Sequence, residues 1–302
     1  MYHQPVLLYE TIAGLINNLE GIYVDVTFGG GGHARKILNV ISATKGRLIG
    51  FDQDKDAANN IISDPRFQFV QSNFRNLKKF LQFHKAYPVD GILGDLGVSS
   101  YQFDEPARGF SYRFDESLDM RMDRNKETTA ADIVNTYPSQ KLAKLLFAFG
   151  EVQNAHKIAA LIEKARRLVP ILTTVKLAEV VTPVLPKGKE NKVLSQIFQA
   201  LRIEVNMEMD ALQSLLEQSV DALKPGGRIA IISYHSLEDR LVKNFFTTGN
   251  IEGKLHKDFY GNPLTPFKLI TKKAIIPTEQ EIEQNPRARS AKLRIAEKTI
   301  RP

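Results

Sequence analysis

The 302-residue sequence contains no cysteine and only six histidines. The absence of thiols excludes disulfide bonds, thiolate metal sites and any reaction that uses a cysteine nucleophile. Because the histidines are few and scattered along the chain, we expect no structural zinc and no other metal site. Catalytic chemistry is therefore left to other side chains or to a bound organic cofactor.

Long hydrophobic runs are missing as well. No apolar stretch approaches the roughly 18 to 20 residues that span a bilayer. The N-terminus, residues 1–4 (MYHQ), also lacks the basic start of a signal peptide. We therefore expect no membrane association and a cytoplasmic protein.

The net charge of +7 is unevenly distributed along the chain. From residue 224 to the end there are 15 Lys and Arg against 8 Asp and Glu, whereas the preceding part has 26 of each. A basic C-terminal third is typical of proteins that bind a polyanion such as nucleic acid, but it can equally be solvated surface. Charge alone leaves both interpretations open.

Hydrophobic periodicity divides the chain into a sheet-forming part and a helical part. Short apolar runs of β type alternate with helical patterns in the first hundred residues, with the runs at 21–28, 46–51, 67–71 and 90–96 and the helical patterns at 33–41 and 55–62. This alternation predicts an α/β fold with a doubly wound, mostly parallel sheet.

The character of the sequence changes at about residue 104, where Arg, Asp and Met crowd residues 107–124. Helical patterns then dominate from residue 129 to residue 222, including a stretch at 140–149 that Ser139 could cap and another at 194–223. The sheet pattern resumes at a KPGG turn, residues 224–227. We therefore expect a sheet domain of residues 1–104 and 207–302, interrupted by a helical insertion domain, residues 105–206, for substrate recognition.

A glycine-rich loop, residues 27–33 (TFGGGGH), follows the first predicted strand and opens a helix. Glycines allow close backbone approach, and the helix N-terminus offers N–H groups to a ligand. Asp52, at the end of the second strand, can accept hydrogen bonds from the hydroxyls of a ribose. The pair predicts a nucleoside cofactor, although Gly29, Gly31 and Ala34 also fit the dinucleotide fingerprint and keep a nicotinamide-dependent oxidoreductase open.

The fourth strand ends in Asp95 and runs into a loop that carries Ser99 and Ser100. In a methyltransferase the donor meets the acceptor at this edge of the sheet. An exocyclic amine of a base is a poor nucleophile, and oxygen acceptors can orient it and take its proton. An Asx turn followed by a serine-rich loop is the structural alternative.

After the insertion, residues 233–240 (SYHSLEDR) place a second polar cluster at a strand end. His235, Ser236 and Arg240 are candidates for holding a base or its phosphate, whereas a capped helix start is the structural alternative. Further on, the basic stretch 285–294 (NPRARSAKLR) includes Arg287 and Arg289, whose guanidinium groups match phosphate geometry. A strand with an exposed basic face would explain that stretch equally.

The chain resembles, nearly from end to end, the bacterial methyltransferases that modify N4 of a cytidine in 16S ribosomal RNA. The motifs that carry the resemblance are residues 3–10 (HQPVLLYE), 25–33 (DVTFGGGGH), 95–100 (DLGVSS), 108–112 (RGFSY), 118–123 (LDMRMD), 198–206 (FQALRIEVN), 233–240 and 285–294. It implies a Rossmann-like class I methyltransferase domain with a helical insertion, S-adenosylmethionine as cofactor, and 16S ribosomal RNA within the small ribosomal subunit as partner.

The resemblance also implies cofactor contacts, which fall on Gly31, Gly32, His33, Asp52, Phe74, Asp95 and Gln102. For Phe74 there is an independent reason, because an aromatic ring at that point can lie against adenine. The chain departs from the family pattern at residues 196–197, where Gln-Ile replaces a common Arg-Thr pair, and at Ala34, where Ser is common. The first departure puts a phosphate contact of the insertion in doubt.

Three functions remain to be compared: an RNA methyltransferase, a nicotinamide-dependent oxidoreductase, and a non-catalytic RNA-binding factor for ribosome assembly. The absence of cysteine excludes the usual methylation at cytosine C5, which needs a thiolate. An amino-methyltransferase acting on DNA would more usually carry an Asp/Asn/Ser-Pro-Pro-Tyr/Phe loop where this chain has DLGVSS. The oligomeric state, with a dimer among the options, is not determined by the sequence.

Overall fold

The computed structural model describes residues 5–99, 102–103 and 105–299, and the chain divides into two compact units. Unit 1 comprises Met1–Gly97 and Met209–Pro302, and unit 2 comprises Val98–Glu208. The sequence placed the corresponding boundaries at 104/105 and 206/207. Each unit has hydrophobic core clusters of its own. A role of the helical unit in substrate recognition stays a prediction.

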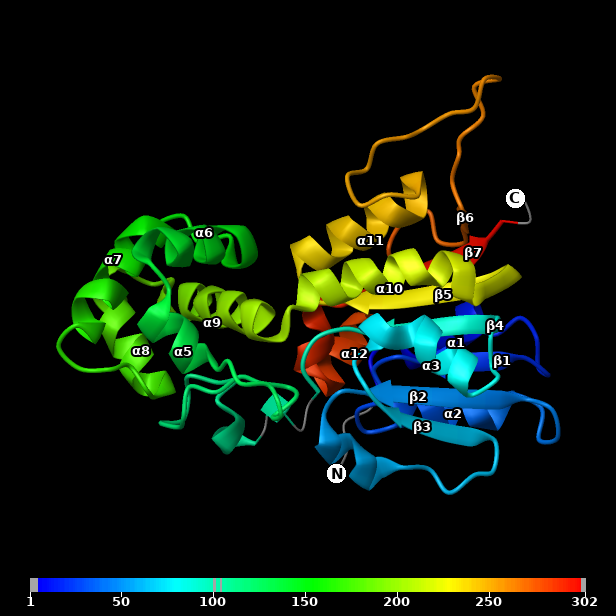
Figure 1. Ribbon diagram of the computed structural model, residues 1–302, viewed down its shortest axis with the longest axis horizontal. Helices are drawn as coiled ribbons and strands as arrows, with labels where there is room; N and C mark the ends of the chain where they lie inside the picture. The colour runs from blue at the N-terminus through cyan, green and yellow to red at the C-terminus, as the bar shows by residue number, and fades with distance from the viewer. Residues whose placement is uncertain (1–4, 100–101, 104, 300–302) are drawn as a thin grey trace. The chain divides into compact units, whose positions relative to one another are not determined.

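Unit 1 is built on a seven-stranded sheet with the order β3-β2-β1-β4-β5-β7-β6 (Figure 1). The strands are β1 (Ile22–Asp25), β2 (Arg47–Asp52), β3 (Phe67–Gln71), β4 (Val89–Asp95), β5 (Leu223–Ser233), β6 (Phe267–Leu269) and β7 (Lys292–Lys298). Strands β1 to β5 are parallel, and β7 runs antiparallel to both β5 and β6. The direction of winding reverses between β1 and β4, which confirms the predicted doubly wound, mostly parallel α/β sheet.

Helices cover both faces of this sheet. Successive side chains of a strand point to opposite faces, and because apolar side chains lie on both faces, each face is buried under helices. On β2, Leu48 belongs to the core under one helical layer and Ile49 to the core under the other. The first layer contains α1 (Leu8–Leu15) and α2 (Gly32–Val40). The second layer contains α3 (Leu77–Phe83), α10 (Glu208–Ala222) and α11 (Ser236–Thr248). Shorter elements are η1 (Lys55–Asn60), η2 (Phe74–Asn76), α12 (Glu279–Gln284) and η5 (Pro286–Ser290).

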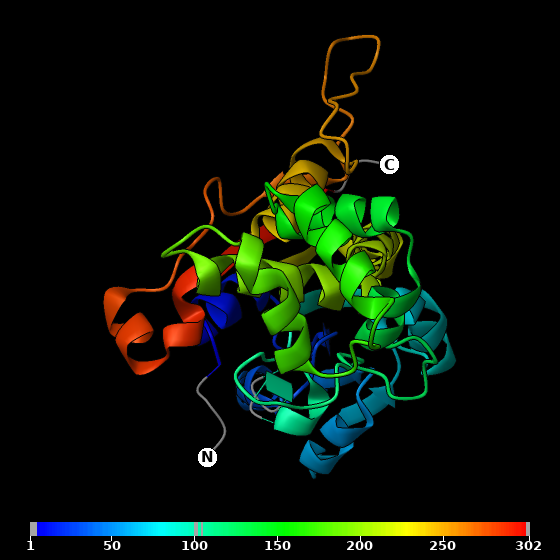
Figure 2. The same ribbon diagram turned by 90° about the vertical axis from the view of Figure 1, so that its left-hand side faces the viewer.

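Unit 2 is helical, as the apolar periodicity predicts (Figure 2). Its elements are η3 (Pro106–Arg108), α5 (Ala130–Thr136), α6 (Ser139–Gly150), α7 (Ala155–Arg166), α8 (Thr174–Val181), η4 (Thr182–Val184) and α9 (Glu190–Asn206). Apolar residues three and four apart, such as Ile158 and Ile162 on α7, are buried in one continuous core. Ile197, at the departure from the family pattern, is fully buried in that core.

Three local predictions were wrong. Ser139 does not cap α6, since it is the first residue of the helix and Pro138 occupies the cap position without a side-chain bond. The helical stretch 194–223 is two helices, because Met207 adopts a left-handed conformation with φ 53° and ends α9. The KPGG segment is not a separate turn but lies within β5, where a register shift opposite Val89 and Gly91 accommodates it.

Candidate functional site

The glycine loop joins β1 to α2 at the carboxyl edge of the sheet. Gly31 is the N-cap of α2 with φ 74°, in the left-handed region that favours glycine. A Cβ atom there would lie 2.9 Å from the Phe28 ring, closer than a side chain tolerates. The Arg35 guanidinium donates to the Gly30 carbonyl at 2.6 Å and fixes the loop from the helix side. These contacts support a loop whose backbone approaches the start of a helix, where N–H groups lack intrahelical partners.

Asp52 ends β2 beside this loop. Its carboxylate accepts hydrogen bonds from the backbone N–H groups of Gly29 and Asp54, both at 2.8 Å. Burial raises the pKa of Asp52 to about 6, although these backbone donors act to lower it. A carboxylate offers about four acceptor positions, so Asp52 can still accept from a ribose hydroxyl. It thus ties the glycine loop to the second strand and retains the chemistry expected for nucleoside binding.

Asp95 lies at the end of β4 in a network of polar side chains. The Tyr234 hydroxyl donates to Asp95 Oδ1 at 2.8 Å, and Asp95 Oδ2 lies 3.7 Å from His33 Nδ1. The Asp95 backbone N–H donates to the Thr27 hydroxyl at 2.6 Å. Since β1, β4 and β5 are neighbours in the sheet, their carboxyl ends bring these groups to one place.

Burial dominates the electrostatics of this edge. It raises the pKa of Asp95 to about 7, while the Tyr234 hydroxyl acts in the opposite direction. It raises the pKa of Asp25, beneath the glycine loop, to about 6 and lowers the pKa of His33. The pKa of Tyr234 lies well above its usual value, first through burial and then through the neighbouring Asp95 charge. Asp95 can therefore bind or release a proton close to neutral pH, as a group that exchanges protons with a substrate must.

The SYHSLEDR motif forms the end of β5 and the start of α11. His235 is the N-cap of α11: its Nδ1 accepts from the Glu238 N–H at 3.4 Å, and its Nε2 lies 3.1 Å from Glu238 Oε1. The Glu238 carboxylate in turn accepts from the Tyr234 N–H at 2.9 Å. The structural alternative for His235, a capped helix start, is present. Ser236 and Arg240 are exposed on α11, and a substrate contact of these three residues stays a prediction.

Phe74 opens η2 directly after β3 and is partly buried against the core. Asn73, immediately before it, donates from Nδ2 to the Gln53 side chain at 2.8 Å. Because Gln53 follows Asp52, this bond holds Phe74 next to the end of β2. Residue 74 therefore lies near the end of β2 in the fold, and the role of its ring toward adenine stays a prediction.

The remaining predicted contacts belong to unit 2. Ser99 and Gln102 bind each other, since the Ser99 N–H donates to Gln102 Oε1 at 3.1 Å and the Gln102 N–H donates to the Ser99 hydroxyl at 3.2 Å. The Gln102 side chain is buried. Ser100 lies outside the described residues. The serine loop is thus held to Gln102 at Ser99, and the predicted roles of these residues stay predictions.

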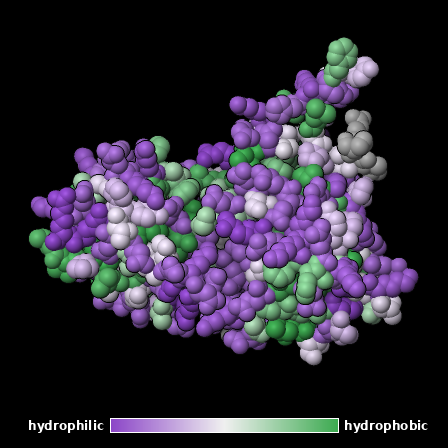
Figure 3. Space-filling model, viewed as in Figure 1, coloured by the Kyte–Doolittle hydropathy of each residue, from purple (hydrophilic) through white to green (hydrophobic). Residues whose placement is uncertain are grey.

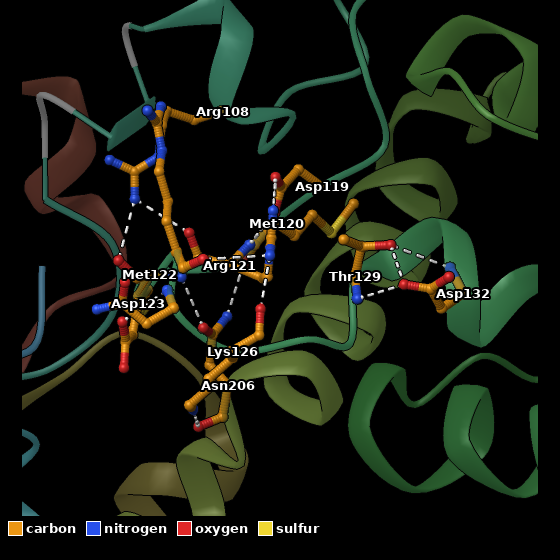
Figure 4. Close-up of polar contacts among 12 residues, drawn as sticks. Arg108, Asp119, Met120, Arg121, Met122, Asp123, Lys126, Thr129, Asp132 and Asn206 are labelled. Carbon is orange, nitrogen blue, oxygen red and sulfur yellow. Dashed lines mark hydrogen bonds and ion pairs between the residues drawn. The ribbon is translucent and has the colours of Figure 1, made fainter.

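Three sequence motifs of unit 2, to which the sequence assigned no role, meet around Arg108, as Figure 4 shows. They are residues 108–112, 118–123 and 198–206. The buried Arg108 guanidinium donates to the carbonyls of Arg121 and Met122 at 3.0 and 3.2 Å. Asn206 holds the same segment from α9: its Oδ1 accepts from the Met122 N–H and its Nδ2 donates to the Met120 carbonyl, both at 2.8 Å. These side chains satisfy backbone groups of an irregular segment, so their function is to fix its shape.

Sequence reasoning missed two residues of the site in unit 1, Tyr234 and Thr27. Tyr234 stands next to His235, which is the more familiar catalytic residue type. The position of Tyr234 could have indicated its role, because it is the first residue after the buried strand β5, and polar side chains at the carboxyl ends of parallel strands form the site. Which of several polar residues at a strand end turns inward is decided by packing, and the sequence does not give it.

The basic stretch near the C-terminus separates into two parts. Arg294 and Lys292 on β7 form ion pairs with Asp239 at 2.7 and 3.3 Å. Arg287 and Arg289, on the preceding 3-10 helix η5, are exposed. Arg287 and Arg289 are thus the more exposed cations of this stretch, and their contact with phosphate stays a prediction.

Two sequence comparisons point to the same family. A sequence model described as the MraW methylase family matches residues 1–299. The "Ribosomal RNA small subunit methyltransferase H" of Bacteroides thetaiotaomicron is 55% identical over 297 residues, which cover 98% of this chain and 97% of that protein. The protein of the same name from Flavobacterium johnsoniae is also 55% identical, covering 98% of both chains. A solved rRNA methylase from Streptococcus thermophilus aligns with a TM-score of 0.41 at 12% identity, covering 97% of this chain and 93% of that one. Within the described residues, no helix has the length and apolar character needed to cross a membrane.

Proposed function

The chain belongs to the MraW methylase family, and from this premise we propose that it transfers a methyl group from S-adenosylmethionine to the exocyclic N4 of a cytidine in 16S ribosomal RNA of the small ribosomal subunit. The observation that carries the proposal is the full-length similarity, at 55% identity, to proteins named as small-subunit ribosomal RNA methyltransferases. The choice of N4 and of 16S RNA rests on the motif resemblance, and such a substrate places the enzyme in the bacterial cytoplasm.

The residues at the carboxyl edge of the sheet fit a nucleoside cofactor. In our proposal Gly31, Gly32 and His33 line the loop side, Asp52 accepts from the ribose hydroxyls, and Phe74 lies against the adenine. Asp95 and Gln102 complete the set. S-adenosylmethionine supplies an activated methyl group, and the protein's contribution is to hold that group and the acceptor amine in register.

The chemistry assigned to the protein is orientation of the amine and removal of its proton. The lone pair of an exocyclic N4 is delocalised into the ring, so an oxygen acceptor has to orient the amine. Asp95 suits this role, because the Tyr234 hydroxyl donates to Oδ1, and Oδ2, which lies 3.7 Å from His33 Nδ1, can accept a hydrogen bond from N4. When the amine gains the methyl group it must lose one proton. Asp95 Oδ2 can accept that proton, since the pKa of Asp95 is about 7, and then release it to solvent.

We propose direct displacement without a covalent enzyme–RNA adduct, because the chain has no thiol to add to the ring. The target base has to leave its stack to reach the sheet edge. His235, Ser236 and Arg240 are candidates for holding the extruded base or its phosphate. Arg287 and Arg289 are the candidates for contact with the RNA backbone.

The decisive experiment is single-turnover methylation of purified small ribosomal subunits, with free 16S RNA and duplex DNA as comparison substrates, followed by mass analysis of the nucleosides. We expect N4-methylcytidine in the RNA. Asp95→Ala and Ser236→Ala should slow the step by well over threefold, whereas the exposed Ser63→Ala should not. Rates within about threefold of wild type, or about 0.7 kcal/mol of barrier, would remove both residues from the mechanism. Binding of NAD rather than S-adenosylhomocysteine in calorimetry would favour the oxidoreductase alternative.

A further inference from the structure

A narrow hairpin, residues 254–264, extends from unit 1 between α11 and β6 and ends in two exposed aromatic side chains. Phe259 is 97% exposed and Tyr260 85% exposed. Their rings lie 5.5 Å apart at 87°, so they contact each other by an edge and leave ring faces to solvent. Figure 1 shows this segment in orange, extending away from the sheet and its helices. Burying two such rings would be favourable, and a surface that keeps them exposed points to a partner.

The aromatic hairpin, as we call residues 254–264, has a defined shape. Its arms pair through an antiparallel bridge between Lys257 and Pro263. At the tip the Asp258 carboxylate accepts from the backbone N–H groups of Tyr260 and Asn262 at 2.9 and 2.8 Å. Gly261 turns the chain with φ 84°. The two rings are therefore displayed by an ordered turn, which lowers the entropy cost of binding a partner.

The surroundings of the rings carry charge of one sign. Residues 253–273 contain five lysines, one aspartate and no glutamate. All five lysines are exposed, namely Lys254, Lys257, Lys268, Lys272 and Lys273. Asp258, the single acid, is engaged in the turn. Figure 3 shows hydrophobic atoms at the outer end of the segment, with hydrophilic surface below them.

We propose that the aromatic hairpin is an RNA-binding element in which Phe259 and Tyr260 stack on unpaired bases while Lys254 and Lys257 contact the adjoining phosphates. Exposed aromatic rings beside cationic side chains are the means by which proteins bind single-stranded RNA. A second copy of the chain would bring like charges together, and an acidic protein would not need the ring faces. The inference rests on the proposed function, to which it adds an RNA contact outside the sheet edge.

The test measures binding of the full-length protein to a fluorescent 16-nucleotide single-stranded RNA, to the matching RNA duplex, and to protein-free 16S RNA. Phe259→Ala with Tyr260→Ala should weaken single-strand binding at least about fivefold, equal to about 1 kcal/mol, and should leave the salt dependence unchanged. Lys254→Ala with Lys257→Ala should lower the slope of log affinity against log salt by about 0.7 for each phosphate that the variant no longer binds.

Two controls accompany these variants. Phe83→Ala removes an equally aromatic side chain, 76% exposed on α3, and should leave RNA affinity unchanged. Phe259→Trp with Tyr260→Trp retains the stacking faces and should restore binding. All variants should keep the wild-type melting temperature, because the exchanged residues are exposed.

Unchanged affinity for single-stranded RNA in the double alanine variant would overturn the proposal. So would a weaker affinity for assembled small ribosomal subunits, measured in parallel, together with an unchanged affinity for protein-free 16S RNA, because this result would indicate a protein partner. A dimer that light scattering finds in the wild type and not in the double alanine variant would indicate self-association and would likewise overturn the proposal. If the wild type methylates 16S RNA while the hairpin variants bind normally, this inference alone fails. If the wild type methylates no cytidine but the hairpin variants lose RNA affinity, the proposed function fails and the RNA contact stands.

Discussion

A carboxyl group at the end of a buried strand costs free energy when it is ionised, and Asp95 and Asp52 both occupy such positions. Each carboxyl group accepts hydrogen bonds that partly offset this cost. The Tyr234 hydroxyl donates to Asp95, and the N–H groups of Gly29 and Asp54 donate to Asp52. Burial nevertheless raises the pKa of both groups well above the value of about 3.9 in an unfolded chain. The two residues therefore reduce stability at neutral pH, which is common for carboxyl groups at binding and catalytic sites.

The first prediction concerns Asp95 and pH. A carboxyl group with a raised pKa in the folded state contributes stability below its unfolded pKa, and this contribution is lost as pH rises from about 4 to about 7. Asp95→Asn cannot ionise and still accepts from Tyr234. In thermal unfolding without cofactor, the variant should match wild type near pH 4 and exceed it at pH 8 by on the order of 1 to 4 kcal/mol. Equal stability at both pH values would contradict the burial argument.

The second prediction concerns Asp52. Asp52→Ala removes the acceptor for the ribose hydroxyls and should weaken binding of S-adenosylmethionine by roughly 1.5 to 3 kcal/mol, the range for hydrogen bonds to a charged group. Asp52→Asn retains an oxygen that can accept from the Gly29 N–H, so the loop should keep its shape. A loss of affinity in this variant therefore reports the ribose contact and not a changed loop. Asp221→Ala, a surface change on α10, is the control. Calorimetry should show the loss for both Asp52 variants, and an unchanged affinity would return Asp52 to a purely structural role.

At the scale of elements, the basic stretch 285–294 spans a short 3-10 helix and the start of a strand. Its cationic side chains are exposed on the helix and form ion pairs on the strand. Strand β7 lies beside β5 and faces the start of α11, so Lys292 and Arg294 reach Asp239. The short 3-10 helix η5 precedes the strand, and Arg287 and Arg289 on it are exposed. For Asp239, burial acts to raise the pKa but the ion pairs outweigh it, and its pKa is lowered. The pairs stabilise the join between helix and sheet rather than an RNA complex.

The third prediction follows from this division. Arg287→Ala with Arg289→Ala should weaken RNA binding and reduce the salt slope by about one unit for each phosphate that is released, without altering cofactor affinity. Replacing Lys45 and Lys79, two exposed lysines elsewhere on unit 1, removes the same charge and should not change the slope. Binding measured at several salt concentrations gives the answer. An unaltered slope in the arginine variant would assign η5 to solvated surface.

At the scale of the whole molecule, the two units have separate hydrophobic cores, and most of the proposed cofactor contacts lie in unit 1. A ligand that binds the folded state stabilises what it binds by about 2.7 kcal/mol at a hundred times its Kd. The effect of the cofactor should therefore be uneven along the chain. Hydrogen exchange of backbone amides can measure this difference in stabilisation, because amides exchange when cooperative regions of the structure open locally, without unfolding of the whole protein.

The fourth prediction concerns this difference between the units in how much the bound cofactor stabilises them. Saturating S-adenosylhomocysteine should slow hydrogen exchange in β1 and β4 by up to about a hundredfold, while amides of α6 and α7 should exchange as before. Mass spectrometry of peptic fragments resolves the two sets. Equal slowing in both would indicate one cooperative unit and would contradict the independence of the two cores. The Asp52→Ala variant at the same ligand concentration serves as control, since it should lose the protection.

The sequence by itself determined the doubly wound sheet, the helical insertion and the position of the glycine loop. These follow from periodicity and from residues next to one another in the chain, such as the glycines of residues 29–32 and the alternation along β2. It also placed Asp52 and Asp95 at strand ends, because a strand end is a local feature.

The tertiary structure alone decided which polar groups face each other. Tyr234 reaches Asp95 across 139 positions of sequence, and Asn206 fixes a segment 84 positions before it. It also paired Arg294 with Asp239 and left Phe259 and Tyr260 exposed. The physical reason is the same in each case: a hydrogen bond, an ion pair or a buried ring depends on which distant strands and helices become neighbours. Local spacing carries no information on that choice.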